Sequence, residues 1–87
     1  MGAPARIARP GQPSDVEMVR IEDMSDHGAR IVTAQRWQPG DGLIIYSQGQ
    51  LARLAVGKVI YCQPLSQGHF VIGCWFDEGI GIQPSVR

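Results

Sequence analysis

The sequence predicts an all-β fold, a small antiparallel barrel or sandwich, and three observations support this class. Short apolar runs rich in β-branched residues are separated by turn residues at regular spacing. No long amphipathic helical pattern interrupts these runs. The chain has 87 residues, which is enough for one domain with a small core. We expect about six strands, and closing them into a barrel would protect the strand edges.

The N-terminal half contains three expected strands. Prolines and glycines break regular structure in residues 1–15, so we expect a flexible segment in which residues 5–9 form a short edge strand. Residues 16–22 carry apolar side chains suited to a half-buried strand, and residues 29–33 form the next one. The expected barrel spans residues 16–80.

The C-terminal half contains the other three strands, at residues 43–46, 51–61 and from 70 to 76, followed by a tail at 81–87. The turn residues Pro39 and Gly40 precede the first of them. In the last hairpin, opposition of Tyr61 with Phe70 would place one set of residues in the core: Val59, Tyr61, Phe70, Ile72, Cys74 and Phe76. The outward set would be Ile60, Cys62, His69, Val71 and Trp75, although one bulge would invert part of this pattern.

Composition limits the classes of partner. Eight basic and eight acidic residues cancel, so the broad positive field needed for binding DNA or RNA polymers is absent. No apolar run is long enough for a membrane span and no signal peptide begins the chain, so we expect a cytoplasmic protein. In the register above Cys62 and Cys74 lie too far apart for a disulfide, and no metal-ligand spacing is present, so neither a metal site nor a cofactor is expected.

The segment Asp23-Met24-Ser25-Asp26-His27-Gly28 lies between two expected strands. It combines an acceptor carboxylate, a hydroxyl and a glycine that supplies unusual backbone angles or close backbone approach. Such a loop can contact a nucleobase. The alternative is a turn whose side chains satisfy only its own backbone groups. His27 is assigned no role.

Asp23, Ser25 and Gly28 form an Asp-x-Ser-x-x-Gly motif, and Gly73-Cys74-Trp75-Phe76 follows near the end of the sequence. In these features the sequence resembles the PilZ domain, a small bacterial module. The resemblance covers roughly residues 5–78. It implies a six-stranded antiparallel barrel, often followed by a C-terminal helix, and cyclic di-GMP as ligand. Glycines and a proline after residue 78 disfavour that helix, which we expect to be short, absent or beyond the end of this sequence.

PilZ domains that bind cyclic di-GMP generally carry an Arg-x-x-x-Arg motif ahead of the first strand, and this sequence lacks it. Its nearest candidates, Arg6 and Arg9, are three residues apart and fall on the expected first strand. Arg30 alternates outward beside the loop, where it can reach an anion. An outward Trp75 can stack on guanine, or it can cover a neighbouring strand or a subunit partner. The expected ligand-binding residues are Asp23, Ser25, Gly28, Arg6, Arg9, Arg30 and Trp75.

Two functions compete at this point. The first is a bacterial signalling module that binds cyclic di-GMP through the motif loop, orders the N-terminal arginines and couples the ligand to a protein partner. The second is a degenerate PilZ-like interaction domain that has lost the nucleotide and works through Ile60, Val71 and Trp75, with self-association left open. No nucleophile, base and orienting group form a recognisable arrangement, so we do not expect an enzyme.

Overall fold

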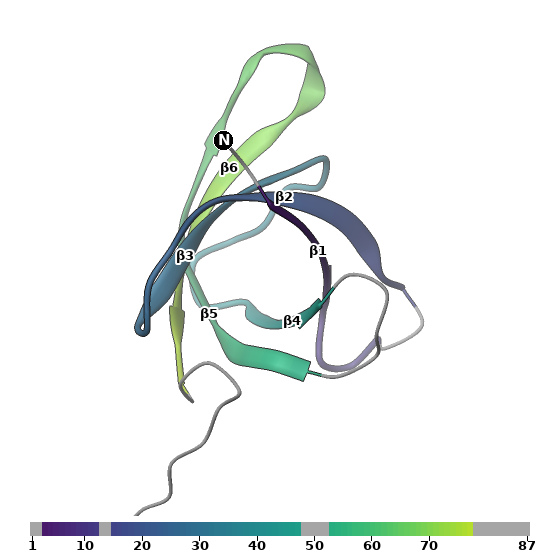
Figure 1. Cartoon of the computed structure of the whole chain (residues 1–87). Helices are drawn as coiled ribbons and strands as arrows, with labels where there is room; N and C mark the ends of the chain where they lie inside the picture. The colour runs from purple at the N-terminus through teal and green to yellow at the C-terminus, as the bar shows by residue number, and fades with distance from the viewer. Residues whose placement is uncertain (1–2, 13–14, 48–52, 78–87) are drawn as a thin grey trace, which may run out of the picture.

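The structure is a computed structural model that describes residues 3–12, 15–47 and 53–77. In these ranges six antiparallel strands close into a barrel in the order β1-β2-β3-β6-β5-β4 (Figure 1). The predicted all-β class and six-stranded barrel are confirmed. The strands are β1 (Ala3–Ala8), β2 (Glu17–Met24), β3 (Gly28–Thr33), β4 (Gly42–Ser47), β5 (Arg53–Pro64) and β6 (Phe70–Phe76), with a short 3₁₀ turn at Ser66–Gly68 before β6.

The first strand closes the barrel. Its residues pair with β2 on one side, where Arg6 lies opposite Met18, and with β4 on the other, where Arg6 lies opposite Tyr46. The expectation of an edge strand at residues 5–9 was therefore wrong. Ala5, Ile7 and Ala8 are buried, so the apolar side of this short segment is used in the core.

Side chains along each strand point alternately into and out of the barrel, and the inward-facing ones form the core. Ile7, Ile31, Leu43, Ile45 and Ile72 have essentially no exposed surface. The chain crosses the end of the barrel between β3 and β4, because β3 pairs with β6 and β4 pairs with β1 and β5. This crossing buries the indole of Trp37.

The β5–β6 hairpin differs from its expected register. Pro64, not Tyr61, lies opposite Phe70, and the register shifts again between Val59 and Tyr61. The shift is a bulge at Ile60, which leaves both Ile60 and Tyr61 exposed. The placement of Tyr61 on the core face was therefore wrong.

The rest of that hairpin follows the expectation in part. Val59, Ile72, Cys74 and Phe76 are buried, and Trp75 faces outward. Phe70 is only half-buried, and the half-buried Cys62 packs against the core instead of facing solvent. Both cysteines are free thiols.

Some predicted features lie outside the described residues: the start of the fifth strand at 51 and the tail at 81–87. The domain boundaries stay a prediction. No helix in the described ranges is both long enough and apolar enough to cross a membrane.

Candidate functional site

The motif loop is a tight turn held by Ser25. β2 ends at Met24 and β3 begins at Gly28. The Ser25 backbone N–H donates to the Gly28 carbonyl at 2.9 Å, and the His27 N–H donates to Ser25 Oγ at 3.2 Å. The Ser25 hydroxyl lies 3.5 Å from the same Gly28 carbonyl. Ser25 thus satisfies its own turn, and one acceptor position on Oγ remains for a ligand.

Gly28 is needed for close packing of two strands. A Cβ atom at this position would lie 2.3 Å from the Cys74 carbonyl oxygen on β6. Among the described glycines only Gly40 and Gly68 have positive φ. The expectation of unusual backbone angles at Gly28 was therefore wrong. The close approach that the structure shows at Gly28 is to β6, and close approach to a ligand stays a prediction.

Next to the motif loop, a row of paired residues runs across four strands. Asp23 on β2 lies opposite Arg30 on β3, Arg30 lies opposite Gly73 on β6, and Gly73 lies opposite Tyr61 on β5. Asp23 and Arg30 are exposed on the outer face. The Tyr61 ring covers Gly73 so closely that a Cβ on Gly73 would meet it at 2.2 Å. The row therefore offers a carboxylate, a guanidinium and an aromatic ring in sequence.

Trp75 lies beside this row, opposite Gly28 on β3 and Lys58 on β5. Its side chain is 57% exposed. The His27 ring stacks on the indole with centroids 5.6 Å apart and an angle of 12° between the ring planes. His27 thus connects the motif loop to β6, a role that the sequence did not reveal because it depends on the pairing of β3 with β6.

These residues surround one groove, which we call the motif groove, with a volume of about 420 Å³. This volume falls within the range of small-molecule sites. Five of the seven predicted ligand-binding residues line it: Asp23, Ser25, Gly28, Arg30 and Trp75. Its other lining residues are Met24, Ala29, Ile60, Tyr61, Gly73 and Cys74.

Tyr61 was missed as a site residue because the bulge at Ile60 turns it outward. An alternating pattern carries no signal for such a bulge. The groove consequently has an aromatic wall on the β5 side, which the sequence did not predict. It can accept hydrogen bonds at Asp23, pair with an anion at Arg30 and stack on a planar ring at Trp75.

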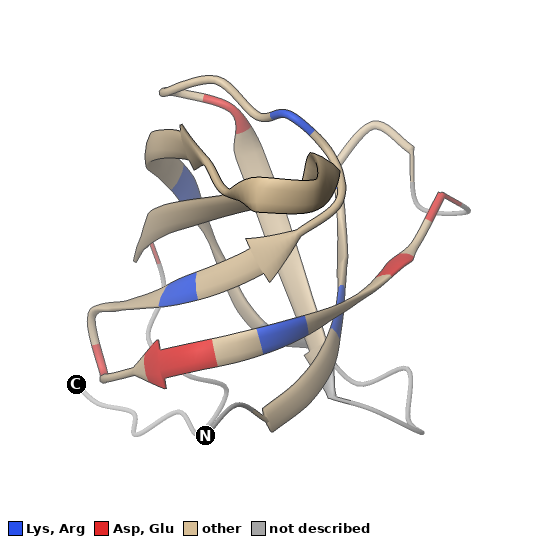
Figure 2. Cartoon of the chain, turned by 90° about the horizontal axis from the view of Figure 1, so that it is seen from above, with Lys and Arg blue, Asp and Glu red and all other residues tan. Residues whose placement is uncertain are grey.

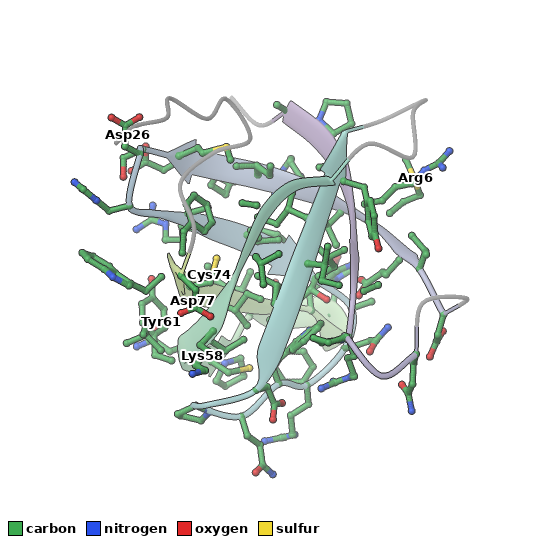
Figure 3. All side chains as sticks on the ribbon, turned by 90° about the horizontal axis from the view of Figure 1, so that it is seen from below. Arg6, Asp26, Lys58, Tyr61, Cys74 and Asp77 are labelled. Atoms are coloured by element: carbon green, nitrogen blue, oxygen red, sulfur yellow. The ribbon has the colours of Figure 1, made fainter. Side chains whose placement is uncertain are left out.

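Arg6 and Arg9 line no part of the motif groove. Arg6 lies opposite Met18, five residues along β2 from Asp23, which is roughly 16 Å of strand. Figure 3 shows Arg6 and the loop residue Asp26 on opposite sides of the barrel. Ligand contact by Arg6 stays a prediction that this placement does not favour.

Arg9 is engaged in the fold. Its Nη1 donates to Asp41 Oδ2 at 3.1 Å, its Nη2 donates to the Arg36 carbonyl at 3.2 Å, and its guanidinium lies 3.9 Å from the centre of the Trp37 ring. Asp41 also accepts from the Gln38 N–H at 2.9 Å. This backbone hydrogen bond, together with Arg9, holds the pKa of Asp41 below its ordinary value. A ligand contact by Arg9 also stays a prediction, which this engagement of its guanidinium does not favour.

Two further ionisable groups lie at or beside the groove. Burial raises the pKa of the Cys74 thiol to about 11, so this group is neutral at physiological pH and offers no thiolate. The hydrogen bond from Arg20 holds the pKa of Glu22 below its ordinary value, so Glu22 carries a negative charge. No group of three His, Cys, Asp or Glu residues that could hold a metal ion occurs in the described part of the chain, and the expectation of no metal site stays a prediction.

Comparison with known protein families assigns the chain to a family. A family model described as PilZ domain matches residues 2–84. PilZ domains are ligand-binding signalling modules of the cyclic di-GMP type and are not a catalytic family. No curated protein matches the chain. Because the family match covers nearly the whole sequence, the chain belongs to the PilZ domain family.

Proposed function

We propose that this PilZ domain binds cyclic di-GMP in the motif groove. The observation that carries the proposal is the convergence of Asp23, Ser25 and Arg30 from the β2–β3 hairpin with Trp75 from β6 on one groove. Asp23 accepts hydrogen bonds from the donor edge of a guanine, and Ser25 Oγ offers a further acceptor. Arg30 pairs with phosphate or a guanine acceptor, and Trp75 stacks on the base.

Without an Arg-x-x-x-Arg motif the site should bind the anionic ligand less tightly, but Arg30 still supplies one positive charge in the groove. Arg30 lies directly opposite Asp23, so its positive charge offsets the carboxylate where the anionic ligand would enter. We further propose that the domain works in the cytoplasm, passes the signal to a protein partner, and needs no cofactor or metal. The zero formal net charge supports the exclusion of DNA and RNA polymers as ligands.

Calorimetric titration with cyclic di-GMP tests the proposal. Wild-type protein should bind saturably, and Asp23→Ala should weaken binding by about tenfold or more, because hydrogen bonds to a charged group are lost. Asp26→Ala is the matched control, since Asp26 is an exposed acid of the same loop that does not line the groove. Asp26→Ala should not weaken binding. Absence of both binding heat and a thermal shift in the wild type would overturn the proposal.

A protein-interaction role is the second candidate, and one observation favours it. Ile60 and Trp75 are 55% and 57% exposed on the same side of the barrel, and the half-buried Val71 lies nearby on β6. Apolar residues gathered in this way are typical of contact surfaces. If this surface mediates self-association, wild-type protein should elute as an oligomer from a sizing column, and Trp75→Ala should elute as a folded monomer. A wild type that stays monomeric at high concentration would remove self-association.

A further inference from the structure

A second groove lies next to the motif groove on the outer face of the barrel. It has a volume of about 330 Å³ and shares Arg30 and Tyr61 with the motif groove. Its own residues include Arg20, Val32, Gln63 and Val71. The shared residues make the two grooves neighbouring compartments of one surface.

The strand register explains why they adjoin. Arg20 on β2 lies opposite Val32 on β3, Val32 lies opposite Val71 on β6, and Val71 lies opposite Gln63 on β5. This second row is two residues along β3 and β6 from the row through Arg30, so both rows face outward. Arg20 and Arg30 are therefore diagonal neighbours on adjacent strands, within reach of one anion.

The second groove differs chemically from the motif groove. Figure 2 shows one basic position on β3 and, on β2, a basic position that lies between acidic ones. Both Arg20 and Arg30 line the second groove, and its remaining acid, Glu22, is the salt-bridge partner of Arg20. The Arg20 side chain in this pair is 59% exposed. Exposed ion pairs of this kind contribute little to stability, so a phosphate can replace Glu22 as the partner of Arg20.

We propose that the second groove takes the phosphate-bearing second half of a cyclic dinucleotide whose first base occupies the motif groove, with Arg20 and Arg30 as its cationic pair. This inference rests on the proposed function. It gives the chain two arginines at the ligand, from β2 and β3, although the Arg-x-x-x-Arg motif is missing. Tyr61, on the wall between the grooves, would contact both halves, and Val32 and Val71 form an apolar floor on which a second base can lie.

Arginine variants and a half-sized ligand test the inference. Arg20→Gln should weaken cyclic di-GMP binding by about tenfold or more, because a charge-assisted contact is lost. The same variant should change the affinity for 3′,5′-cyclic GMP by less than about twofold. This ligand carries one base and one phosphate, and its base would occupy the motif groove, away from Arg20. Arg36→Gln is the matched control, because Arg36 is an exposed arginine that lines neither groove. It should leave both affinities unchanged.

Amide shifts locate the ligand directly. In ¹⁵N-labelled protein, cyclic di-GMP should move the backbone resonances of Val32, Gln63 and Val71 together with those of the motif loop. One outcome would overturn the inference while the proposed function stands. In it, cyclic di-GMP binds and Asp23→Ala abolishes binding, but Arg20→Gln keeps the wild-type affinity and the three resonances do not move. If wild-type protein shows no binding of cyclic di-GMP at all, both fall.

Discussion

The ring of His27 lies nearly parallel to the indole of Trp75, with centroids 5.6 Å apart, and this stack joins the motif loop to the last strand. A second link runs alongside it, where the Phe76 N–H donates to the His27 carbonyl at 2.7 Å. His27 therefore positions the most exposed aromatic side chain of the motif groove. Neither residue contributes to the core, so their removal should affect binding more than folding.

The stack predicts a fluorescence signal for ligand binding. The chain has two tryptophans, of which Trp37 is buried and Trp75 is exposed. Cyclic di-GMP should change the emission of wild-type protein saturably, and Trp75→Phe should lose this change while the emission of Trp37 remains. His27→Ala should weaken binding several-fold and alter the free energy of unfolding by less than about 0.5 kcal/mol. Binding that leaves the Trp75 emission unchanged would contradict a groove walled by this indole.

Gly28 should prove essential for stability. Gly28→Ala places a methyl group where the Cys74 carbonyl lies 2.3 Å away, so β3 and β6 must separate. We expect a loss of about 2 kcal/mol or more in the free energy of unfolding, measured in urea. Gly11→Ala is the matched control, because a Cβ there meets no atom within 4 Å. Equal stability of the two variants would rule out this packing explanation for the motif glycine.

Arg9 should matter for folding and not for the ligand. Arg9→Gln removes the ion pair with Asp41 and the cation–π contact with Trp37, which should cost about 1–2 kcal/mol of unfolding free energy. Cyclic di-GMP affinity should stay within about twofold of the wild type. Urea unfolding and calorimetry measure the two effects separately. A large loss of affinity with unchanged stability would instead restore Arg9 as a ligand contact.

Cys74 should make the domain sensitive to alkaline pH. Its pKa is raised by burial from 9.0 to about 11, so the unfolded thiol loses its proton first as pH rises. The stabilisation from the neutral thiol is therefore complete below about pH 9 and is lost as pH rises from 9 to 11.

Alkaline unfolding curves of two variants check this assignment. Cys74→Ala should unfold with a shallower dependence on pH between 9 and 11, whereas Cys62→Ala should keep the wild-type slope. Iodoacetamide should also modify the half-buried Cys62 faster than the buried Cys74. Equal slopes for the two variants would show that Cys74 does not cause the loss of stability between pH 9 and 11.

Features that depend on residues close together in the chain could be predicted from the sequence alone. Short apolar runs bounded by turn residues predicted the six strands, and Pro39 and Gly40 predicted the turn before β4, where Gly40 has a φ of 95°. The spacing of Asp23, Ser25 and Gly28 located the motif loop. These predictions held because strand periodicity and turn chemistry are properties of short chain segments.

The pairing of the strands and the surroundings of their outward residues became clear from the three-dimensional fold and not from the sequence. The pairing of β3 with β6 brings His27 to Trp75, and the bulge at Ile60 turns Tyr61 into the wall between the grooves. Arg9 stacks on Trp37, 28 positions later in the sequence, because the β3–β4 crossing closes the end of the barrel. Strand register and crossing are set by packing between distant segments, and local sequence pattern does not encode either one.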